Sequence, residues 1–139
     1  MDYRKEAEEA FEYMRKVNGF PIMRAMNDVS QGEMAVVGHL TFKQDGITAG
    51  ELSAAFGLGS SRIAAILNTL TKKGLAKRAS DPEDGRVVRV YVTDKGRREA
   101  MRRRDNTNAH LAGFLELLGE EDAKEFLRII KKAAAMRER

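Results

Sequence analysis

The sequence predicts a mainly α-helical protein with one small β-hairpin. Three observations support this fold class. Apolar residues recur at helical spacing along most of the chain, capping motifs and glycines divide that pattern into separate helices, and residues 86–92 alternate after a D-P-E-D-G turn. With 139 residues the chain can bury a real core, either as one domain or as a small domain plus an oligomerisation element.

Residues 48–73 are predicted to form two short helices joined by a tight turn. Thr48 and Glu51 make a T-x-x-E capping box, which marks the start of the first helix. The G-L-G sequence that follows Phe56 is too short for anything but a sharp reversal. The second helix is then expected to begin at Ser60, with the serine hydroxyl as its N-cap.

The second of these helices has one apolar face and one polar face. The spacing i, i+3, i+4, i+7 predicts a buried stripe made of Ile63, Ile66, Leu67 and Leu70. At about 100° per residue, the outward face carries Ser61, Ala65, Asn68 and Lys72, with Arg62 beside them. Small and hydrogen-bonding side chains on an exposed helix face suit close approach to base edges in a DNA groove. We therefore interpret residues 60–73 as a DNA-reading helix.

Positive charge is concentrated in the middle of the chain. The net charge of +4 conceals a segment, residues 60–104, that has thirteen Lys or Arg against five Asp or Glu and so carries +8. The other residues together carry −4. Such asymmetry is expected when one segment faces a polyanion. A solvated face with no partner is the alternative explanation of the charge pattern.

Residues 75–80 and 86–92 are predicted to be the two strands of a hairpin. Their alternation is expected to give a dry face with Val88, Val90 and Val92. Three arginines make the hairpin cationic: Arg78, Arg86 and Arg89. Asp84 lies two residues before Arg86 and is expected to orient its guanidinium. An arginine at such a tip can enter a narrow, A·T-rich minor groove, where the negative potential is enhanced.

The N-terminal part is predicted to be helical. Residues 2–18 form an amphipathic helix, and residues 22–26 are expected to be a short turn of helix or a linker. Ser30 and Glu33 make an S-x-x-E capping box, which predicts a helix that runs to about Phe42. A lone terminal helix cannot keep an apolar stripe in water. It therefore packs within the chain or, as we prefer, on a second subunit.

The C-terminal part completes this pattern. A helix is predicted over residues 94–118, with a basic first half and an apolar second half. Gly119 breaks it, and a last helix opens with three acidic residues and ends with basic ones, as the helix dipole favours. Three amphipathic terminal segments suggest a shared helical bundle. A symmetric dimer is the natural use of such a bundle, because a palindromic DNA site needs two reading heads.

Composition excludes several classes of protein. The absence of cysteine excludes a disulfide framework and removes the usual structural zinc ligands, and 6% aromatic residues supply a single-strand stacking platform poorly. No catalytic or cofactor motif is present, and His39 lacks metal-ligand partners, so we expect no enzyme, cofactor or metal. No stretch approaches the roughly 18 apolar residues of a membrane span, and there is no signal peptide, so a cytoplasmic location is expected.

With these residues in view, the chain resembles the MarR (multiple antibiotic resistance regulator) family of winged helix-turn-helix transcription factors. The resemblance rests on the sequences SQGEMAVVGHL, ITAGELSAAFGLGSSRIAAILNTLTKKGLAKR and DPEDGRVVRVYVTDKG, the last of which looks like the family's wing. It implies a winged helix-turn-helix core over residues 30–96. The core is flanked by an N-terminal dimerisation helix and linker, residues 1–29, and by C-terminal dimerisation helices, residues 97–139.

The resemblance also implies how the protein binds its partners. A homodimer would sit on a palindromic operator, with the reading helix in the major groove and the wing in the adjacent minor groove. Family positions carried over are Asp84 and Arg86 of the wing and Ser60, Ser61, Arg62 and Ala65 of the helix; Gly85 departs from the family, because many members have an arginine there. Members commonly release DNA when a small, often aromatic or phenolic acid enters a cleft between the dimer helices and the core. Tyr13, Phe20 and Met23 are candidate lining residues, with filling of the core as their alternative use.

The predicted function is therefore a sequence-specific transcriptional regulator that binds double-stranded DNA, as a repressor relieved by a small-molecule effector. The expected DNA-binding residues are Ser60, Ser61, Arg62, Ala65, Asn68, Lys72, Lys77, Arg78, Asp84 and Arg86. The alternative is a winged-helix module for protein interaction or DNA architecture without sequence-specific regulation. Against it, a protein-docking surface is usually depleted in lysine.

Overall fold

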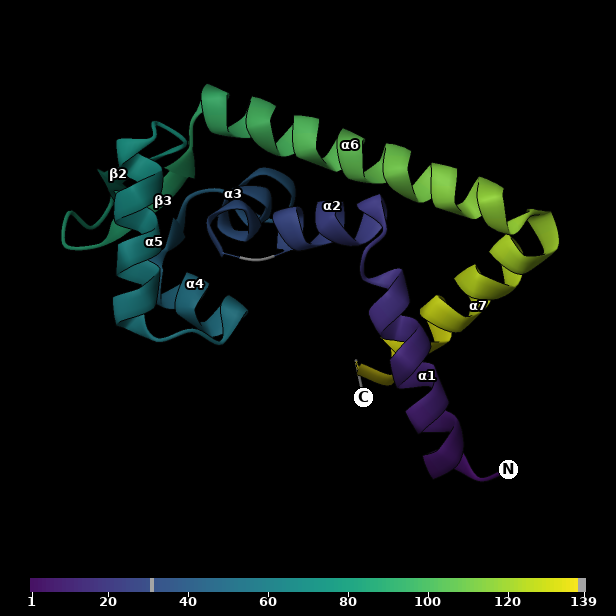
Figure 1. The fold of residues 1–139 in the computed structure, drawn as a ribbon. Helices are drawn as coiled ribbons and strands as arrows, with labels where there is room; N and C mark the ends of the chain where they lie inside the picture. Colours follow the sequence, from purple (N-terminus) through teal and green to yellow (C-terminus); the bar gives the residue numbers. More distant parts are fainter. Residues whose placement is uncertain (31, 138–139) are drawn as a thin grey trace.

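The structure is a computed structural model that describes residues 1–30 and 32–137, without the side chains of residues 28–30. Its helices and strands follow the predicted order (Figure 1). In chain order they are α1 Tyr3–Val17, α2 Pro21–Ser30, α3 Gly32–Phe42, β1 Ile47–Thr48, α4 Ala49–Phe56, α5 Ser60–Lys72, β2 Ala76–Ser80, β3 Val88–Val92, α6 Asp94–Leu118 and α7 Glu120–Arg137. The fold is thus mainly helical with a small sheet, as the sequence predicts.

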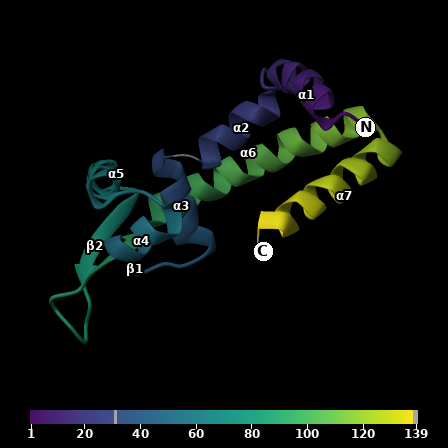
Figure 2. The same cartoon turned by 90° about the horizontal axis from the view of Figure 1, so that it is seen from below.

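The molecule has two ends joined by one long helix. Helices α3, α4 and α5 gather with the sheet at one end, and α1 and α7 lie at the other (Figure 1). The 25-residue helix α6 runs between the two ends, and α2 packs along it (Figure 2). The hairpin of β2 and β3 projects beyond the helices in both views. Helix α6 is therefore the mechanical link between the two ends.

The sheet contains a strand that the sequence pattern did not reveal. The strand order is β1-β3-β2 and both pairings are antiparallel, so β3 lies between its two partners. Ile47 of β1 pairs with Val90, and Ala76 of β2 pairs with Val92. Strand β1 has only two residues, too few to show an alternating pattern. It nevertheless ties the start of α4 to the base of the hairpin.

The hydrophobic core lies at the end with the sheet. Leu52 of α4 and Leu70 of α5 are fully buried, and the predicted stripe of α5 is buried throughout. The remaining core residues come from every element around them: Val36, Val37, Leu40, Ile47, Leu75, Ala76, Val90, Val92 and Ala100. Ala100 belongs to α6, so the long helix contributes to this core.

The junction between the core and α6 is unusually tight. Thr93 caps α6 as predicted, because its Oγ1 accepts a hydrogen bond from the Gly96 N–H at 3.0 Å, and the same hydroxyl donates to the Gly74 carbonyl at 2.6 Å. A Cβ atom placed on Gly96 would lie 2.1 Å from the Leu75 carbonyl oxygen. The first turn of α6 thus packs directly on the backbone that follows α5, which only glycine permits.

Most predicted helix boundaries are confirmed, with two corrections. Thr48 caps α4, accepting the Glu51 N–H at 3.1 Å. The expected cap of α5 is wrong, because Gly59 is the N-cap without a side-chain hydrogen bond and Ser60 is already helical. The segment at residues 22–26 is not a linker but belongs to α2, which proline opens at its N-terminus. The expected Ser30 capping contact lies outside the described side chains.

Candidate nucleic-acid interface

The outward face of α5 is exposed to solvent. Every candidate residue on it is exposed: Ser60, Ser61, Arg62, Ala65, Asn68 and Lys72. Arg62 and Lys72 form no ion pair with any described residue. The face therefore offers two cations and several small polar groups to an external partner.

The hairpin tip carries a preoriented arginine. Asp81 accepts hydrogen bonds from the backbone N–H groups of Glu83 and Asp84, which shape the turn. Asp84 in turn holds Arg86 with two contacts, from Nε at 3.1 Å and from Nη2 at 3.3 Å. The Arg86 side chain is nevertheless 92% exposed. Its hydrogen bonds also lower the pKa of Asp84, so the carboxylate stays charged and keeps the guanidinium aimed.

Arg89 corrects the prediction of three cationic arginines at the hairpin surface. Its Nε donates to Asp81 at 2.5 Å and its Nη1 donates to the Gly46 carbonyl at 2.9 Å. The side chain is 32% exposed, and its hydrogen bond lowers the pKa of Asp81. Arg89 therefore joins the hairpin base to the loop before β1. Val88, expected on the dry face, is 48% exposed, because the sheet extends past the helices there.

The two basic residues of β2 lie on opposite faces of the sheet. Arg78 pairs with Val90 and shares the face of that buried valine, whereas Lys77 pairs with Tyr91 on the other face. Both side chains are exposed, and neither has an ion-pair partner in the described part of the chain. A single flat surface thus cannot engage both, whereas a partner that wraps the hairpin can.

Much of the other positive charge in the middle of the chain is balanced internally. Glu33 holds Lys73 at 2.8 Å, Asp94 holds Arg97 at 3.3 Å, and Glu99 holds both Arg102 and Arg103. The cations without such a partner among the described residues include Arg62, Lys72, Lys77 and Arg78. They belong to α5 and the adjoining strand. Part of the excess charge of the sequence therefore lies, without an ion pair among the described residues, on α5 and the hairpin.

A pocket of about 370 Å³ lies between α3, α4 and α6. Its lining is largely apolar, with Met34, Phe42, Phe56 and Ala100, and includes the cations Lys43, Arg103 and Arg104. The Arg104 guanidinium lies 4.1 Å from the centre of the Phe42 ring. The sequence pattern does not reveal this pocket, because its lining residues come from helices that are far apart in the chain. Spaced apolar residues of α3 and α6 were the available signal.

The three predicted effector residues do not line this pocket. Phe20 instead faces Phe114 of α6 at 6.2 Å between ring centres, beside a second depression near the α1–α2 junction. Tyr13 is 58% exposed on α1, where the Lys16 ammonium lies 4.8 Å from its ring centre. Met23 is half-buried on α2. These three residues thus lie outside the pocket between α3, α4 and α6, and their part in effector binding stays a prediction.

The outer helices expose apolar faces in the single chain. Large side chains are open to solvent on α1 and on α7: Tyr3, Phe11, Met14, Leu127, Ile129, Ile130 and Met136. Neither helix contains a fully buried residue. Exposed apolar side chains in this number on two helices are typical of an interaction site.

Residues 1–30 and 32–137 were considered for membrane-spanning helices and for metal-binding groups. No helix among them combines the length and apolar character needed to cross a bilayer. No group of three or more His, Asp or Glu in that part is arranged to hold a metal ion.

Comparison with known proteins gives a consistent result. A family model described as "MarR family" matches residues 27–87. An uncharacterised HTH-type transcriptional regulator of Bacillus subtilis, YdgJ, is 28% identical over 114 residues, which cover 81% of this chain and 66% of YdgJ. The match thus spans just under two thirds of that relative's length.

Solved structures extend the similarity to the whole fold. A MarR family protein from Bacillus stearothermophilus superposes with a TM-score of 0.78 at 22% identity, covering 100% of this chain and 99% of that one. FabT of Streptococcus pneumoniae, solved in complex with DNA, gives 0.74 at 19% identity, covering 99% and 98%. The family model thus matches the winged core, and the shared fold continues through α1, α6 and α7. Residues 27–87 thus match the MarR family model, and the chain as a whole shares the fold of a MarR family structure.

Proposed function

We propose that this protein is a sequence-specific transcriptional regulator that binds double-stranded DNA through α5 and the hairpin, which we call the wing (residues 76–92). The observation that carries the proposal is an exposed polar face on α5 together with an exposed Arg86 that a carboxylate holds. An α-helix fits the major groove, and an arginine at a projecting tip suits a narrow minor groove. FabT, whose fold this chain shares, was solved in complex with DNA, which supports DNA as the partner.

The candidate residues take different roles in this proposal. Those near the start of α5 read base edges, because their side chains are short and exposed: Ser60, Ser61, Arg62, Ala65 and Asn68. Lys72, Lys77 and Arg78 contact phosphates, which adds affinity without sequence preference. Arg86 occupies the minor groove and Asp84 aims it. No catalysis is part of the proposal.

The proposal includes a homodimer. The apolar side chains of α1 and α7 remain exposed in a single chain. A second copy presents the same apolar faces and would bury them in a symmetric interface. Residues 1–29 and 97–139 would form this dimer, and residues 30–96 would form each reading head. Two heads related by a two-fold axis match a palindromic operator. A regulator must reach the chromosome, which is in keeping with the expected cytoplasmic location.

We also propose that the protein is a repressor relieved by a small acid. The pocket between α3, α4 and α6 supports this part, because a largely apolar lining that includes cationic groups suits an aromatic carboxylate or phenolate. The pocket lies where the reading core meets α6, so a ligand there contacts both.

Selection of bound duplexes from a random library tests the proposal. The purified full chain is expected to recover a palindromic consensus whose half-sites lie about one helical turn apart. Sedimentation of the free protein and of the complex is expected to show a dimer. Recovery of duplexes with no consensus would contradict sequence-specific regulation and favour an architectural role. A strictly monomeric protein would contradict the two-headed arrangement.

A further inference from the structure

One arginine of α6 lies at the boundary between the proposed effector pocket and the reading helix. Arg103 lines the pocket between α3, α4 and α6. It also lines a hollow shared with Arg62 and Ile66 of α5, and another shared with Lys73 and Lys95. Its side chain is only 24% exposed. A group in this position contacts whatever enters the pocket and remains close to the base of α5.

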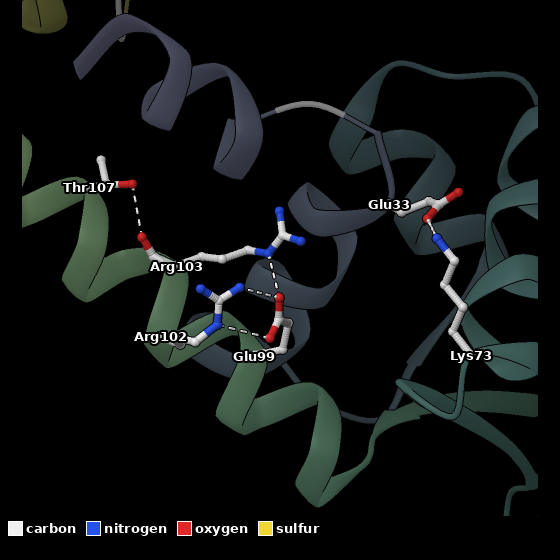
Figure 3. A network of polar contacts seen from close by, with 6 residues as sticks. All are labelled: Glu33, Lys73, Glu99, Arg102, Arg103 and Thr107. Carbon is white, nitrogen blue, oxygen red and sulfur yellow. Dashed lines mark hydrogen bonds and ion pairs between the residues drawn. The ribbon is translucent and has the colours of Figure 1, made fainter. Parts of the chain in front are cut away.

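Arg103 is held by a carboxylate that has a second cationic partner. Its Nε donates to Glu99 Oε1 at 2.8 Å, and Arg102 donates to the same carboxylate at 2.7 and 3.2 Å (Figure 3). These hydrogen bonds lower the pKa of Glu99 to about 2, so it is ionised at neutral pH. Arg102 is well placed to retain Glu99 when Arg103 turns away.

The far end of α5 is attached to the same region. Lys73, which follows the last residue of α5, forms an ion pair with Glu33 of α3 at 2.8 Å (Figure 3). Lys95 of α6 donates to the Lys73 carbonyl at 2.8 Å. Glu33, Lys73, Lys95, Glu99 and Arg103 all line one hollow. Any change in the hold on Glu99 therefore alters the charges around the end of α5.

We propose that Arg103 is the positioning residue that couples occupancy of the pocket to α5. An anion in the pocket competes with Glu99 for the Arg103 guanidinium. When the anion binds Arg103, Glu99 keeps only Arg102, and its negative charge is less neutralised. Glu99 then attracts Lys73 and Lys95 more strongly, which weakens the Glu33–Lys73 pair. The end of α5 then loses its tie to α3, and the two arrangements form a two-state element that the anion biases. This inference rests on the proposed DNA-binding function and names the regulation of its pocket.

The test uses full-length protein, the duplex recovered by selection, and benzoate as an anionic aromatic probe with benzamide as its neutral counterpart. Wild-type protein is expected to bind the duplex several-fold more weakly in saturating benzoate, within the roughly 5- to 150-fold range of allosteric couplings, and to ignore benzamide. Arg103→Gln is expected to bring this ratio close to one. The matched control is Arg98→Gln, since Arg98 is exposed on α6 and lines neither the pocket nor the two hollows, and it is expected to keep the ratio.

A second variant predicts changes that a merely structural role would not produce. Glu99→Gln weakens the hold on Arg103 before any anion arrives and removes the charge that would act on Lys73. It is therefore expected to bind benzoate more tightly than wild type, while its affinity for the duplex no longer responds to benzoate. Equal coupling in wild type and Arg103→Gln, or no coupling in wild type, would overturn the inference and leave DNA binding intact. A wild-type protein with no preferred duplex would instead overturn the proposed function itself.

Discussion

The two ends of the molecule differ in what holds them together. The winged core is complete within one chain, with Leu52 and Leu70 fully buried and polar contacts closing its turns. The outer helices α1 and α7 bury no residue fully and leave Phe11, Ile129 and Ile130 in solvent. Amphipathic helices occur at both ends, but only those of the winged core bury their apolar faces within the chain. The difference shows that helical pattern alone does not tell which partner a helix packs on.

The largest expected effect comes from opening a cavity in the core. Leu70→Ala is expected to lower the free energy of unfolding by about 2–5 kcal/mol, because the side chain is fully buried and its truncation leaves a cavity in the core. Urea denaturation followed by circular dichroism measures this. The comparison partner is Ile130→Ala on α7, where the side chain is 50% exposed in one chain. We expect that change to raise the dimer dissociation constant on the order of tenfold, seen by sedimentation, with little effect on the core. Equal effects of both variants on core unfolding would abolish the contrast.

A second prediction concerns the junction that joins the two ends. Gly96→Ala is expected to destabilise the protein by about 1–3 kcal/mol or more, because its Cβ would collide with the Leu75 carbonyl. Gly38→Ala in α3 is the control, since a Cβ there meets nothing within 4 Å. It is expected to be neutral or to stabilise by about 0.5–1 kcal/mol, through better helix propensity. Thermal unfolding of both variants decides the point. A Gly96→Ala protein as stable as wild type would show that the junction is loose.

Within the core, the wing and the reading helix are expected to contribute differently to DNA binding. Arg86→Ala should cost on the order of 1–3 kcal/mol in operator affinity, because a preoriented minor-groove contact is lost. Lys72→Ala should weaken all sequences similarly and lower the salt slope by about one ion, since it removes a phosphate contact. Gel-shift titrations at several salt concentrations separate the two. Unchanged operator affinity in Arg86→Ala would remove the wing from the interface.

The smallest expected effect concerns acid stability. The pKa of Glu99 is lowered to about 2, so its ion pairs stabilise the fold above the ordinary value near 4.5 and are lost as the pH falls from there toward 2. Because the pairs are near the surface, the contribution is on the order of 1 kcal/mol. Glu99→Gln is therefore expected to flatten the stability profile only in that range, measured by urea denaturation at successive pH values. A loss confined to neutral pH would point to a different cause.

Sequence patterns were sufficient wherever a structure is fixed by near neighbours. The Thr48 and Thr93 caps, the buried stripe of α5 and the Asp84–Arg86 pair all involve residues within seven positions, and all are confirmed. Local chemistry of this kind is readable because the partners travel together along the chain. The N-cap of α5 was missed because serine at the first helical position looks the same in sequence as serine at the cap.

Tertiary structure decided what joins distant segments. It brought Arg89 to Gly46, placed a two-residue strand beside β3, and formed a pocket between α3, α4 and α6, which Tyr13, Phe20 and Met23 do not line. The periodicity of apolar residues predicts which face of a helix is buried. It does not predict which surface that face packs on, because hydrophobic burial is non-directional. The sequence by itself determined the local elements of the winged core, namely two of its helix caps, the buried face of α5 and the turn of the hairpin. The packing of α6 across both ends determined the pocket and the position of Arg103 at its edge.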